Sequence, residues 1–561
     1  MILCCDFETS SQHMYEEEGE ARVYLWASKE IYNKQHTLTH YKNMAYGISI
    51  KSYFDYLFSI KEDCTIYFHN LSHDGEFIIW ELLRQKYRYN GESDKLYNHQ
   101  FYSLITDDNK YYTIIIKNQG REYEFHCSYR LLPLSIAELG KIVGVEKLSD
   151  TYDYESTRSY KMARQVPEKD LMYIHNDVEI MRLILLQAFG MGIDKLTLAS
   201  SAYYHWKTSQ ITFEREELVS LPDDIQEYVN LSYKGGITQV NPKYQGKIVE
   251  DCCSYDVNSL YPSVMLANSM PYGLPEYVEE SDLIPNKYKY LIFIVATDVE
   301  ICEGYIPFIG IREGFGFNSY QYPEVLLNVE LCLWYDEYEL FKKYYKGNYT
   351  IGKILQFKQR AKVFDKYFEK WKTIKETTKN PAEKKIAKLM MNSLYGKFGS
   401  TKDKRSKIFD KIEGDKLHSR IEEHEVKEFY RPIASFITSC ARCVLIRAME
   451  DCHERFIYCD TDSIYLTGDR QPNIPIHESR LGYWGYEGRI QRFKALKAKC
   501  YVKETGGGVE TRIAGLPKAA QRDYISIDTL EEHLKIEKAK LARKRVKGGI
   551  ILCETDFTIK L

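Results

Sequence analysis

Two aspartates stand one residue apart inside an apolar stretch late in the chain. In YCDTDSIYL, residues 458–466, Asp460 and Asp462 interrupt a run of aromatic and β-branched residues that otherwise predicts a buried strand. A carboxylate buried there costs several kcal/mol unless a positive charge lies beside it. The pair therefore predicts a site that binds a cation.

More carboxylates occur in three separate segments of the first third of the chain. Asp6 and Glu8 lie two apart on a predicted strand, so their side chains point to the same face. Asp74 follows FHNLSH at a predicted strand-to-helix junction, and Tyr173 and Asp177 are four apart on a predicted helix. Four carboxylates suit two divalent metal ions acting on a phosphodiester, with Tyr173 orienting the attacking water.

A lysine-rich helix lies between the aspartate pair and another acid, Asp256, at the end of an apolar strand. On this helix Lys388, Asn392 and Tyr395 fall at i, i+4 and i+7 and form one polar stripe, and Lys375 lies on the preceding helix. Lysines that hold a triphosphate beside a metal site indicate nucleotidyl transfer rather than hydrolysis.

Each of these patterns also has a plain structural interpretation. Two acids flanking one residue on a strand, or Tyr and Asp four apart on a helix, are weak signals when taken singly. A lysine-rich helix face, taken alone, is most simply interpreted as a face exposed to solvent. The order of the segments along the chain, taken together, favours the chemical interpretation.

The totals allow a large soluble enzyme. A chain of 561 residues with 44% apolar and 28% charged residues predicts two or more globular domains. The net charge of −3 means that any basic groove must be local. The sequence has no run of eighteen apolar residues, so no membrane span is predicted. The opening MILCCDFETS does not resemble a signal peptide. Cys440 and Cys443 form one CxxC, which we interpret as buried structural cysteine rather than zinc ligands.

The elements that must position these residues follow from periodicity and capping. Strands are predicted at MILCCDF, CTIYFHN, YYTIIIKN, REYEFHC and within SYDVNSLYPSVM, and helices at 74–87, 168–190, 362–378 and 380–399. At the start of the helix predicted at 380–399, Asn380 can act as the N-cap and Pro381 suits the first turn. Glu383 stands where a capping box has an acid. Residues 266–360 are expected to be largely irregular, 399–428 a solvated insertion, and 546–561 a β-hairpin.

At this point six motifs resemble a known family. DVNSLYPSVM, KLMMNSLYGKFG and YCDTDSIYL resemble motifs A, B and C of family B DNA polymerases, and CDFETS, NLSHDGEF and YIHNDVEI resemble the exonuclease motifs that precede them. YKGG at 233–236, LKAKCY at 496–501 and the final DFTIKL are similar to smaller motifs of the protein-primed phage polymerases of the phi-29 type.

The resemblance implies an α/β and α+β multidomain fold, with an RNase H-like 3′→5′ exonuclease domain followed by a right-hand polymerase domain. It divides the chain into an exonuclease domain (1–190), palm (191–265 and 429–525), terminal-protein region 1 (266–360), fingers (361–398), terminal-protein region 2 (399–428) and thumb (526–561). The two terminal-protein regions are insertions and are assigned by position.

For the polymerase site the resemblance implies the following roles. Asp256 and Asp462, with the backbone of Val257, would bind two metal ions, and Asp460 would lie beside them. Tyr261 would act as a steric gate against a ribose 2′-hydroxyl. The incoming nucleotide would be surrounded by Lys375, Lys388, Asn392 and Tyr395, and the primer end would be steadied by Lys499 and Tyr501.

For the exonuclease site it implies a metal-binding set of Asp6, Glu8, Asp74 and Asp177, with Tyr173 as a catalytic partner. The unpaired primer end would be held by Thr9, Asn70 and Ser128, assisted by Lys147. Between the two sites would lie Tyr233, Gly235 and Gly236, where glycine lets a phosphate backbone approach closely.

Three residues depart from the family pattern near the exonuclease motifs. His73 stands where an aromatic residue is usual, Glu76 where a small one is usual, and Tyr129 where an aliphatic one is usual. None is a metal ligand, so the departures bear on single-strand binding rather than on the chemistry.

The implied enzyme is a DNA-directed DNA polymerase with proofreading exonuclease, processive and strand-displacing, that replicates a linear phage genome. It would use Mg²⁺ or Mn²⁺, two ions per site, together with dNTPs, primer-template DNA, single-stranded DNA and a terminal protein. It would act as a monomer, without a membrane, in the cytoplasm of an infected bacterial host. The alternatives are a family B polymerase that extends only nucleic-acid primers and a catalytically silent DNA-binding scaffold.

Overall fold

The computed structural model of the chain describes all residues except 10–19, 33–43, 149–165, 313–319, 427–428 and 561. Its N-terminal part is built on an eight-stranded sheet of order β3-β2-β1-β4-β8-β7-β6-β5. The strands are β1 Ile2–Thr9, β2 Val23–Glu30, β3 Ala45–Gly47, β4 Cys64–Phe68, β5 Arg88–Tyr89, β6 Gln100–Ile105, β7 Tyr111–Asn118 and β8 Arg121–Cys127. The helices are α2 Ile50–Ser59, α3 Asp74–Arg84, α4 Ser128–Leu131, α5 Ile136–Val143 and α6 Glu168–Gly190.

A second, seven-stranded sheet has the order β21-β20-β19-β10-β18-β17-β9. Its strands are β9 Thr238–Val240, β10 Val249–Val257, β17 Phe456–Asp460, β18 Ser463–Thr467, β19 Trp484–Lys497, β20 Cys500–Thr505 and β21 Gly508–Ile513. The helices around it are α7 Leu198–Ser209, α8 Asp223–Ser232, α9 Leu260–Ala267, α14 Arg431–Asp451 and α15 Lys518–Tyr524. Strands far apart in the sequence therefore meet here, and β10 lies between β18 and β19.

The stretch expected to be irregular is a sheet, so that prediction is wrong. Residues between 270 and 360 form four antiparallel strands, β11 Met270–Val278, β12 Lys289–Ile301, β13 Val325–Trp334 and β14 Tyr345–Arg360, with α10 Tyr335–Tyr344. Register shifts at Ile292/Ile294 and Ala296/Asp298 break the alternation of β12 against β14, which hides the strand pattern.

The predicted helical pair is present as α11 Asp365–Thr377 and α12 Pro381–Ser393, followed by α13 Tyr395–Phe398. Asn380 caps α12 by accepting from the amide of Ala382 at 2.9 Å. Glu383 does not complete a capping box, because its carboxylate accepts from the hydroxyl of Thr378 instead. The short 3₁₀ and π turns are Ser93–Lys95, Phe213–Glu217 and Glu280–Asp282.

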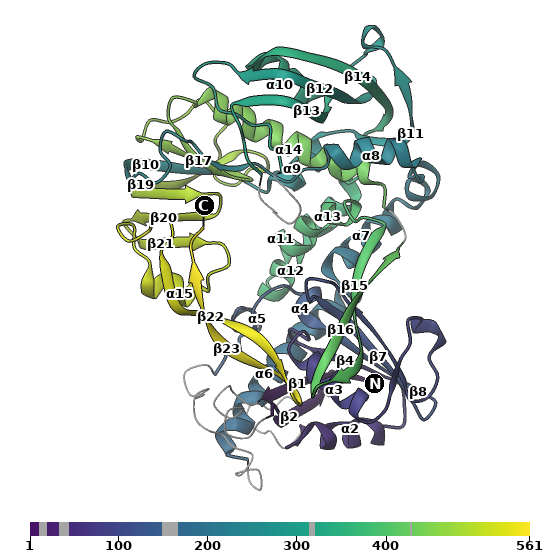
Figure 1. The fold of residues 1–561 in the computed structure, drawn as a ribbon. Coiled ribbons are helices and arrows are strands. Elements are labelled where there is room, and N and C mark those ends of the chain that lie inside the picture. Colours follow the sequence, from purple (N-terminus) through teal and green to yellow (C-terminus); the bar gives the residue numbers. More distant parts are fainter. Residues whose placement is uncertain (10–19, 33–43, 149–165, 313–319, 427–428, 561) are drawn as a thin grey trace.

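Two β-hairpins reach from the C-terminal half of the chain to the N-terminal sheet (Figure 1). They are β15 Asp403–Glu413 with β16 Lys416–Glu425, and β22 Lys535–Val546 with β23 Gly549–Thr558. The C-terminal hairpin is present but begins earlier than predicted, because its first strand is β22 Lys535–Val546 and the predicted range 546–561 holds only the turn and β23. The 399–428 segment is not wholly solvated, because Phe409 and Leu417 are buried in the core of the N-terminal part.

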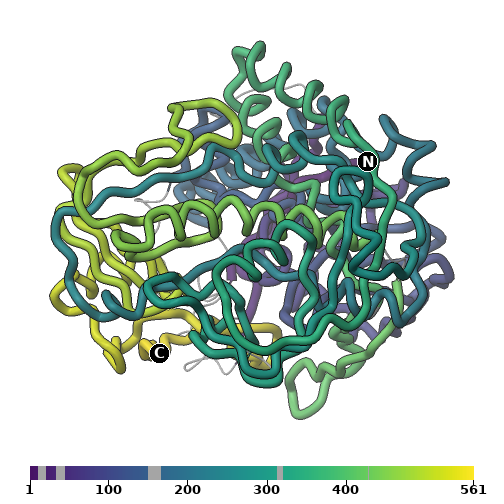
Figure 2. Tube along the Cα trace, turned by 90° about the horizontal axis from the view of Figure 1, so that it is seen from above, coloured from purple at the N-terminus to yellow at the C-terminus, as the bar shows by residue number. Residues whose placement is uncertain are grey.

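Figure 1 and Figure 2 both show that the main sheets lie at different levels of the molecule. In Figure 1 the four-stranded sheet and the eight-stranded sheet lie at opposite ends, with α11 and α12 between them. In Figure 2 the teal and green middle of the chain lies in front of the purple N-terminal part. Among the described helices, α14 is long and apolar enough to cross a membrane, but 89% of its most apolar window is buried inside the protein. Its Cys440 and Cys443 are buried and free, which agrees with structural cysteines.

Candidate functional site: two carboxylate clusters

The first cluster lies where β10 meets the β17–β18 hairpin. Asp256 pairs across the ladder with Ser463, and the amide of Val257 donates to the carbonyl of Asp462 at 2.8 Å. These bonds place the carboxylates of Asp256 and Asp462 on neighbouring strand ends. The turn between Asp460 and Asp462 is tight, and Thr461 there has a left-handed φ of 61°.

The electrostatics of this cluster favour a bound cation. Burial raises the pKa of Asp256 to about 7, with further contributions from Asp462 and Glu487 and an opposing one from Lys388. Burial also raises the pKa of Asp462, helped by Asp460 and opposed by Lys499. Two half-buried acids whose pKa values are both raised fit a divalent ion, which would stabilise both as carboxylates.

Asp460 has a different set of partners. Lys499 donates to both of its carboxylate oxygens, at 2.7 and 2.9 Å, and the hydroxyl of Thr238 donates to Oδ1 at 2.9 Å. Its negative charge is therefore balanced by the protein. Tyr501 is only 8% exposed, but it lines the same cavity as Lys499 and the three aspartates.

A cavity of about 800 Å³ opens in front of the cluster, between the acids and a set of basic side chains. The charged residues that line it are Asp256, Asp460, Asp462, Glu487, Lys499, Lys503, Glu510, Arg512 and Lys518. Glu487 was not identified from the sequence, because a single glutamate on a strand carries no local signal. An acidic floor with a basic rim suits metal ions and the phosphates of a nucleic acid.

The helical pair faces this cluster. Tyr261 on α9 and Tyr395 on α13 stack face to face, with ring centroids 4.2 Å apart and an interplanar angle of 16°. Lys388 and Asn392 are exposed on α12, and Lys388 is close enough to oppose the raised pKa of Asp256. Lys375 is half-buried on α11, and no described contact ties it to the acids.

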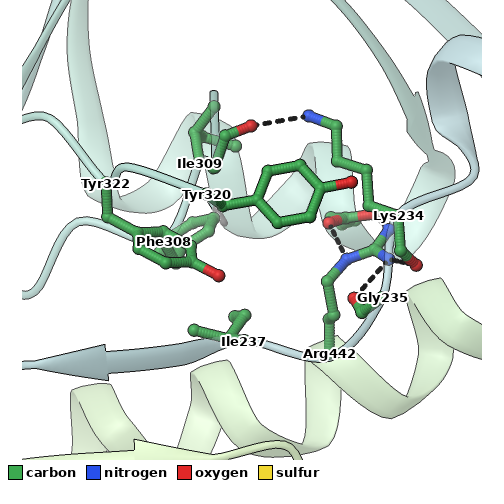
Figure 3. A pocket seen from close by; sticks show the side chains of 10 residues that line it. Lys234, Gly235, Ile237, Phe308, Ile309, Tyr320, Tyr322 and Arg442 are labelled. Carbon is green, nitrogen blue, oxygen red and sulfur yellow. Dashed lines mark hydrogen bonds and ion pairs between the residues drawn. The ribbon is translucent and has the colours of Figure 1, made fainter. Parts of the chain in front are cut away.

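A buried ion pair fixes the backbone of the YKGG segment, residues 233–236 (Figure 3). Arg442 on α14 donates to both carboxylate oxygens of Glu337, at 2.8 and 2.7 Å, and to the carbonyls of Lys234 and Gly235 at 2.8 and 3.2 Å. The pocket beside them measures about 10 Å³, room for about one water molecule and not for a larger ligand.

The glycines of this segment differ in their surroundings. A Cβ on Gly236 would lie 2.7 Å from Thr461 Cγ2 and 3.0 Å from Thr461 Cα, whereas one on Gly235 would meet nothing within 4 Å. Gly236 therefore makes room for the turn between the two aspartates, in addition to any approach by DNA. Tyr233 lies against Gly399, so the segment also contacts the end of α13.

The second cluster lies on the N-terminal sheet. Burial raises the pKa of Asp6 well above its usual value, and Asp74, Glu8 and Asp177 raise it further. The pKa of Asp74, which begins α3, is raised by burial to about 7. The structure thus brings the four predicted acids together from β1, α3 and α6.

Lys147 lies within this cluster. Its ammonium group pairs with Asp177 and lies 4.9 Å from the centroid of the buried Tyr173 ring. The other carboxylate oxygen of Asp177, Oδ1, is buried and has no hydrogen-bond partner among the described residues. An acceptor without a described partner, beside two acids with raised pKa values, Asp6 and Asp74, fits a metal ion.

The residues predicted to hold an unpaired strand lie around this cluster. Thr9 hydrogen-bonds His73 Nε2 at 2.9 Å, and burial lowers the pKa of His73 to about 4, so its ring is neutral. Asn70 is exposed and has a left-handed φ of 65°. Ser128 is 2% exposed and bonds His69 at 3.0 Å, so the structure does not place it at the surface.

Within the described residues, no three His, Cys, Asp or Glu side chains form a ready metal-binding group. In either cluster an ion would take its remaining oxygen ligands from substrate and water.

Comparison with known proteins gives one family. Residues 145–481 match the family of organellar and viral type B DNA polymerases. The DNA polymerase of Bacillus phage M2 is 30% identical over 597 residues, which cover 100% of this chain and 99% of the relative. That of Bacillus phage phi29 is 31% identical over 595 residues, which cover 99% of this chain and 98% of the relative.

The solved structures agree with this. Phi29 DNA polymerase complexed with primer-template DNA matches with a TM-score of 0.88 at 28% identity, covering 100% of both chains. Phi29 DNA polymerase complexed with single-stranded DNA matches with a TM-score of 0.87 at 27% identity, also over 100% of both chains. The fold is therefore the expected one, with an exonuclease domain followed by palm, fingers and thumb. By its family match and by these full-length relatives, the chain belongs to the organellar and viral type B DNA polymerases and is of the phi29 type.

Proposed function

We propose that this DNA-directed DNA polymerase also removes mispaired 3′ ends, starts synthesis on a terminal protein, and copies a linear phage genome processively while displacing the other strand. The observation that carries the proposal is the presence of two separate clusters of acids whose pKa values are raised by partial or full burial, one on each large sheet. One cluster suits nucleotidyl transfer and the other suits phosphodiester hydrolysis.

In the polymerase site Asp256 and Asp462, with the carbonyl of Val257, would hold Mg²⁺ or Mn²⁺. The ions would supply charge neutralisation for the triphosphate and lower the pKa of the attacking hydroxyl. Lys388, Lys375 and Asn392 on the fingers would bind the incoming dNTP, and Tyr261 would exclude a 2′-hydroxyl. Lys499, which holds Asp460, would also steady the primer end.

In the exonuclease site Asp6, Glu8, Asp74 and Asp177 would hold the ions. Tyr173 would orient the attacking water and Lys147, already paired with Asp177, would limit the net negative charge. Thr9, Asn70 and the exposed Tyr129 would hold the unpaired strand, the last by stacking. The neutral ring of His73 orients Thr9.

Protein priming rests on the two insertions and on the relatives. Residues 266–360, with the four-stranded sheet, and 399–428, with the β15–β16 hairpin, would be the terminal-protein regions, added to a palm at 191–265 and 429–525. The fingers would be 361–398, the thumb 526–561, and the exonuclease domain 1–190. The enzyme would act as a monomer in the cytoplasm of an infected bacterial host.

Two variants separate the activities. Asp462→Ala is expected to abolish primer extension while degradation of single-stranded DNA persists. Asp6→Ala with Glu8→Ala is expected to do the reverse. If both activities fell together in a folded variant, the proposal of two sites would be wrong.

Priming needs its own assay, because a polymerase that extends only nucleic-acid primers shares both clusters. The assay measures covalent attachment of a dNMP to a purified terminal protein in Mg²⁺. No attachment, under conditions that support primer extension, would favour that alternative. A protein that neither extends nor degrades DNA would be a silent scaffold.

A further inference from the structure

The tip of the C-terminal hairpin is part of the exonuclease core. Val546, Ile550 and Ile551 are at most 1% exposed and belong to the hydrophobic cluster of the N-terminal part. The amide of Ala21 donates to the carbonyl of Lys547 at 2.8 Å, and Gly549 lies so close to Phe77 that a Cβ there would be 2.5 Å from the ring. The hairpin is therefore fixed on the exonuclease domain by close packing.

Glu76, one of the three departures from the family pattern, fixes the same hairpin electrostatically. It is 3% exposed, and Arg545 on β22 donates to both of its carboxylate oxygens, at 2.8 and 3.0 Å. The guanidinium carbon of Arg545 also lies 4.7 Å from the ring centroid of Phe409 on β15. The planar guanidinium of Arg545 is thus held by the carboxylate of Glu76 and by the ring of Phe409, and these contacts fix the position of β22 relative to α3.

Two residues earlier on β22, Arg543 reaches the loop that precedes Asp74. Its guanidinium donates to the carbonyl of Ser72 at 3.1 Å and to the hydroxyl of Ser72 at 2.8 Å. The hydroxyl of the buried Ser72 in turn donates to Oδ1 of Asn70 at 2.7 Å. A chain of three residues thus links the thumb to an exposed carboxamide at the exonuclease site.

This chain sets which way the Asn70 carboxamide points. Because Ser72 accepts from Arg543, its own proton is directed to Oδ1 of Asn70, and the NH₂ group of Asn70 has no hydrogen-bond partner among the described residues. Asn70 also has a left-handed backbone, which a non-glycine residue keeps only when its surroundings hold it. The NH₂ group is left as a donor for a phosphate oxygen.

We propose that Arg543 is a positioning residue of the 3′→5′ exonuclease reaction: it holds Ser72, and through Ser72 it presents the Asn70 carboxamide to a phosphate of the unpaired primer strand. The inference rests on the proposed exonuclease function. The thumb then completes the exonuclease site without a described hydrogen bond to the acids, although the charge of Arg543 also lowers the pKa of Asp74.

The test measures kcat and KM for degradation of a 5′-labelled single-stranded DNA by the full chain. Arg543→Met keeps the aliphatic part of the side chain and removes the guanidinium group. It is expected to raise KM about tenfold with kcat nearly unchanged, because one charge-assisted hydrogen bond is worth roughly that factor. Arg543→Lys is expected to recover part of the loss. Extension of a matched primer by the same preparations should change by less than about twofold, which shows that the variants fold.

Ser72→Ala tests the chain itself. It is expected to give the same rise in KM, and Arg543→Met with Ser72→Ala should rise no further than the larger single effect. Lys538→Met is the matched control, since it removes a charge from the same strand at a side chain whose ion partner is Glu554 on the neighbouring strand.

The outcomes distinguish failure of the role proposed for Arg543 from failure of the proposed exonuclease function. An unchanged KM in Arg543→Met, effects of Arg543→Met and Ser72→Ala that multiply, or an equal rise in Lys538→Met would overturn the role of Arg543 alone. A wild-type chain that does not degrade single-stranded DNA would overturn the exonuclease function and this inference with it.

Discussion

Asp460 and Asp462 are one residue apart, and their surroundings differ. Lys499 and Thr238 donate to Asp460, whereas Asp462 faces Asp256, and both of these acids have raised pKa values. A positive charge from the protein itself therefore balances the first aspartate. Asp462, with Asp256, is therefore the pair that we expect to bind a cation from solution, as the resemblance implies.

The stack of Tyr261 on Tyr395 gives a prediction about sugar selection. Tyr395→Ala removes the ring that holds Tyr261 in place, so Tyr261 can turn away from the sugar. An aromatic stack contributes about 1 kcal/mol, so discrimination against ribonucleotides should fall by roughly fivefold to tenfold. The measurement is the ratio of kcat/KM for an rNTP and its dNTP. Tyr395→Phe keeps the stack and should keep the ratio; an unchanged ratio in Tyr395→Ala would contradict the role of the stack.

Glu450 on α14 gives a prediction about pH. It is 2% exposed, and burial raises its pKa to about 8, while a bond from the amide of Ile306 at 3.4 Å opposes the rise. Asp451 adds to the rise and Lys343 opposes it. Between the pKa of the unfolded chain and about 8 the folded state holds more protons, so its contribution to stability falls as pH rises through that window.

Glu450→Gln removes this titration. The variant is expected to match the wild type in thermal midpoint near pH 5 and to exceed it above the folded pKa, where the wild type must ionise a buried acid. Thermal unfolding of both proteins across this pH range is the measurement. Parallel pH profiles would show that Glu450 does not titrate in the folded protein.

At the scale of elements, Gly236 and Gly235 form a matched pair. Gly236→Ala pushes a methyl group into Thr461, which must shift the turn that carries Asp460 and Asp462. Primer extension should fall at least about tenfold, since small displacements of reacting groups are costly, while exonuclease activity stays. Gly235→Ala adds the same methyl group in open space and spares the turn, so it is expected to lose much less primer extension, and any loss it shows would report the approach of DNA to this segment. Equal activity in the two variants would contradict the role assigned to this contact.

Local signals predicted the helices well and the insertions poorly. The pattern over 168–190 matches α6, Glu168–Gly190, and Asn380 caps α12 as expected, because periodicity and capping depend on near neighbours. The sheet at 270–360 depends on β12 pairing with both β13 and β14, through bulges that break the two-residue alternation. The acids of both clusters were predictable from motifs. Glu487 was not, because its place beside Asp256 depends on β19 pairing with β10.

At the scale of the molecule, three distant segments meet at one buried ion pair. Glu76 and Arg545 are 469 residues apart, and Phe409 on β15 lies against the same guanidinium. In sequence Glu76 is only a departure that casts doubt on single-strand binding. In the structure it joins the exonuclease domain, the thumb hairpin and the proposed terminal-protein region 2. In the proposed processive enzyme this junction would help to close a path around bound DNA.

Reversing this ion pair should therefore reduce processivity more than the rate of nucleotide addition. Glu76→Arg places two like charges in a site where Glu76 is buried, and leaving one buried charge unpaired costs about 3–5 kcal/mol, somewhat less here because Arg545 is 29% exposed. The thumb hairpin should then leave α3, and product length per binding event on a primed circular template with a competitor trap should fall several-fold. Glu76→Arg with Arg545→Glu restores opposite charges and should recover much of the length. Lys86→Glu is the control, since Lys86 lies just after α3, is exposed and has no ion pair among the described residues. A loss in the double variant equal to that in Glu76→Arg would mean that the bulk of the side chains, and not the charge pair, decides how the hairpin is held.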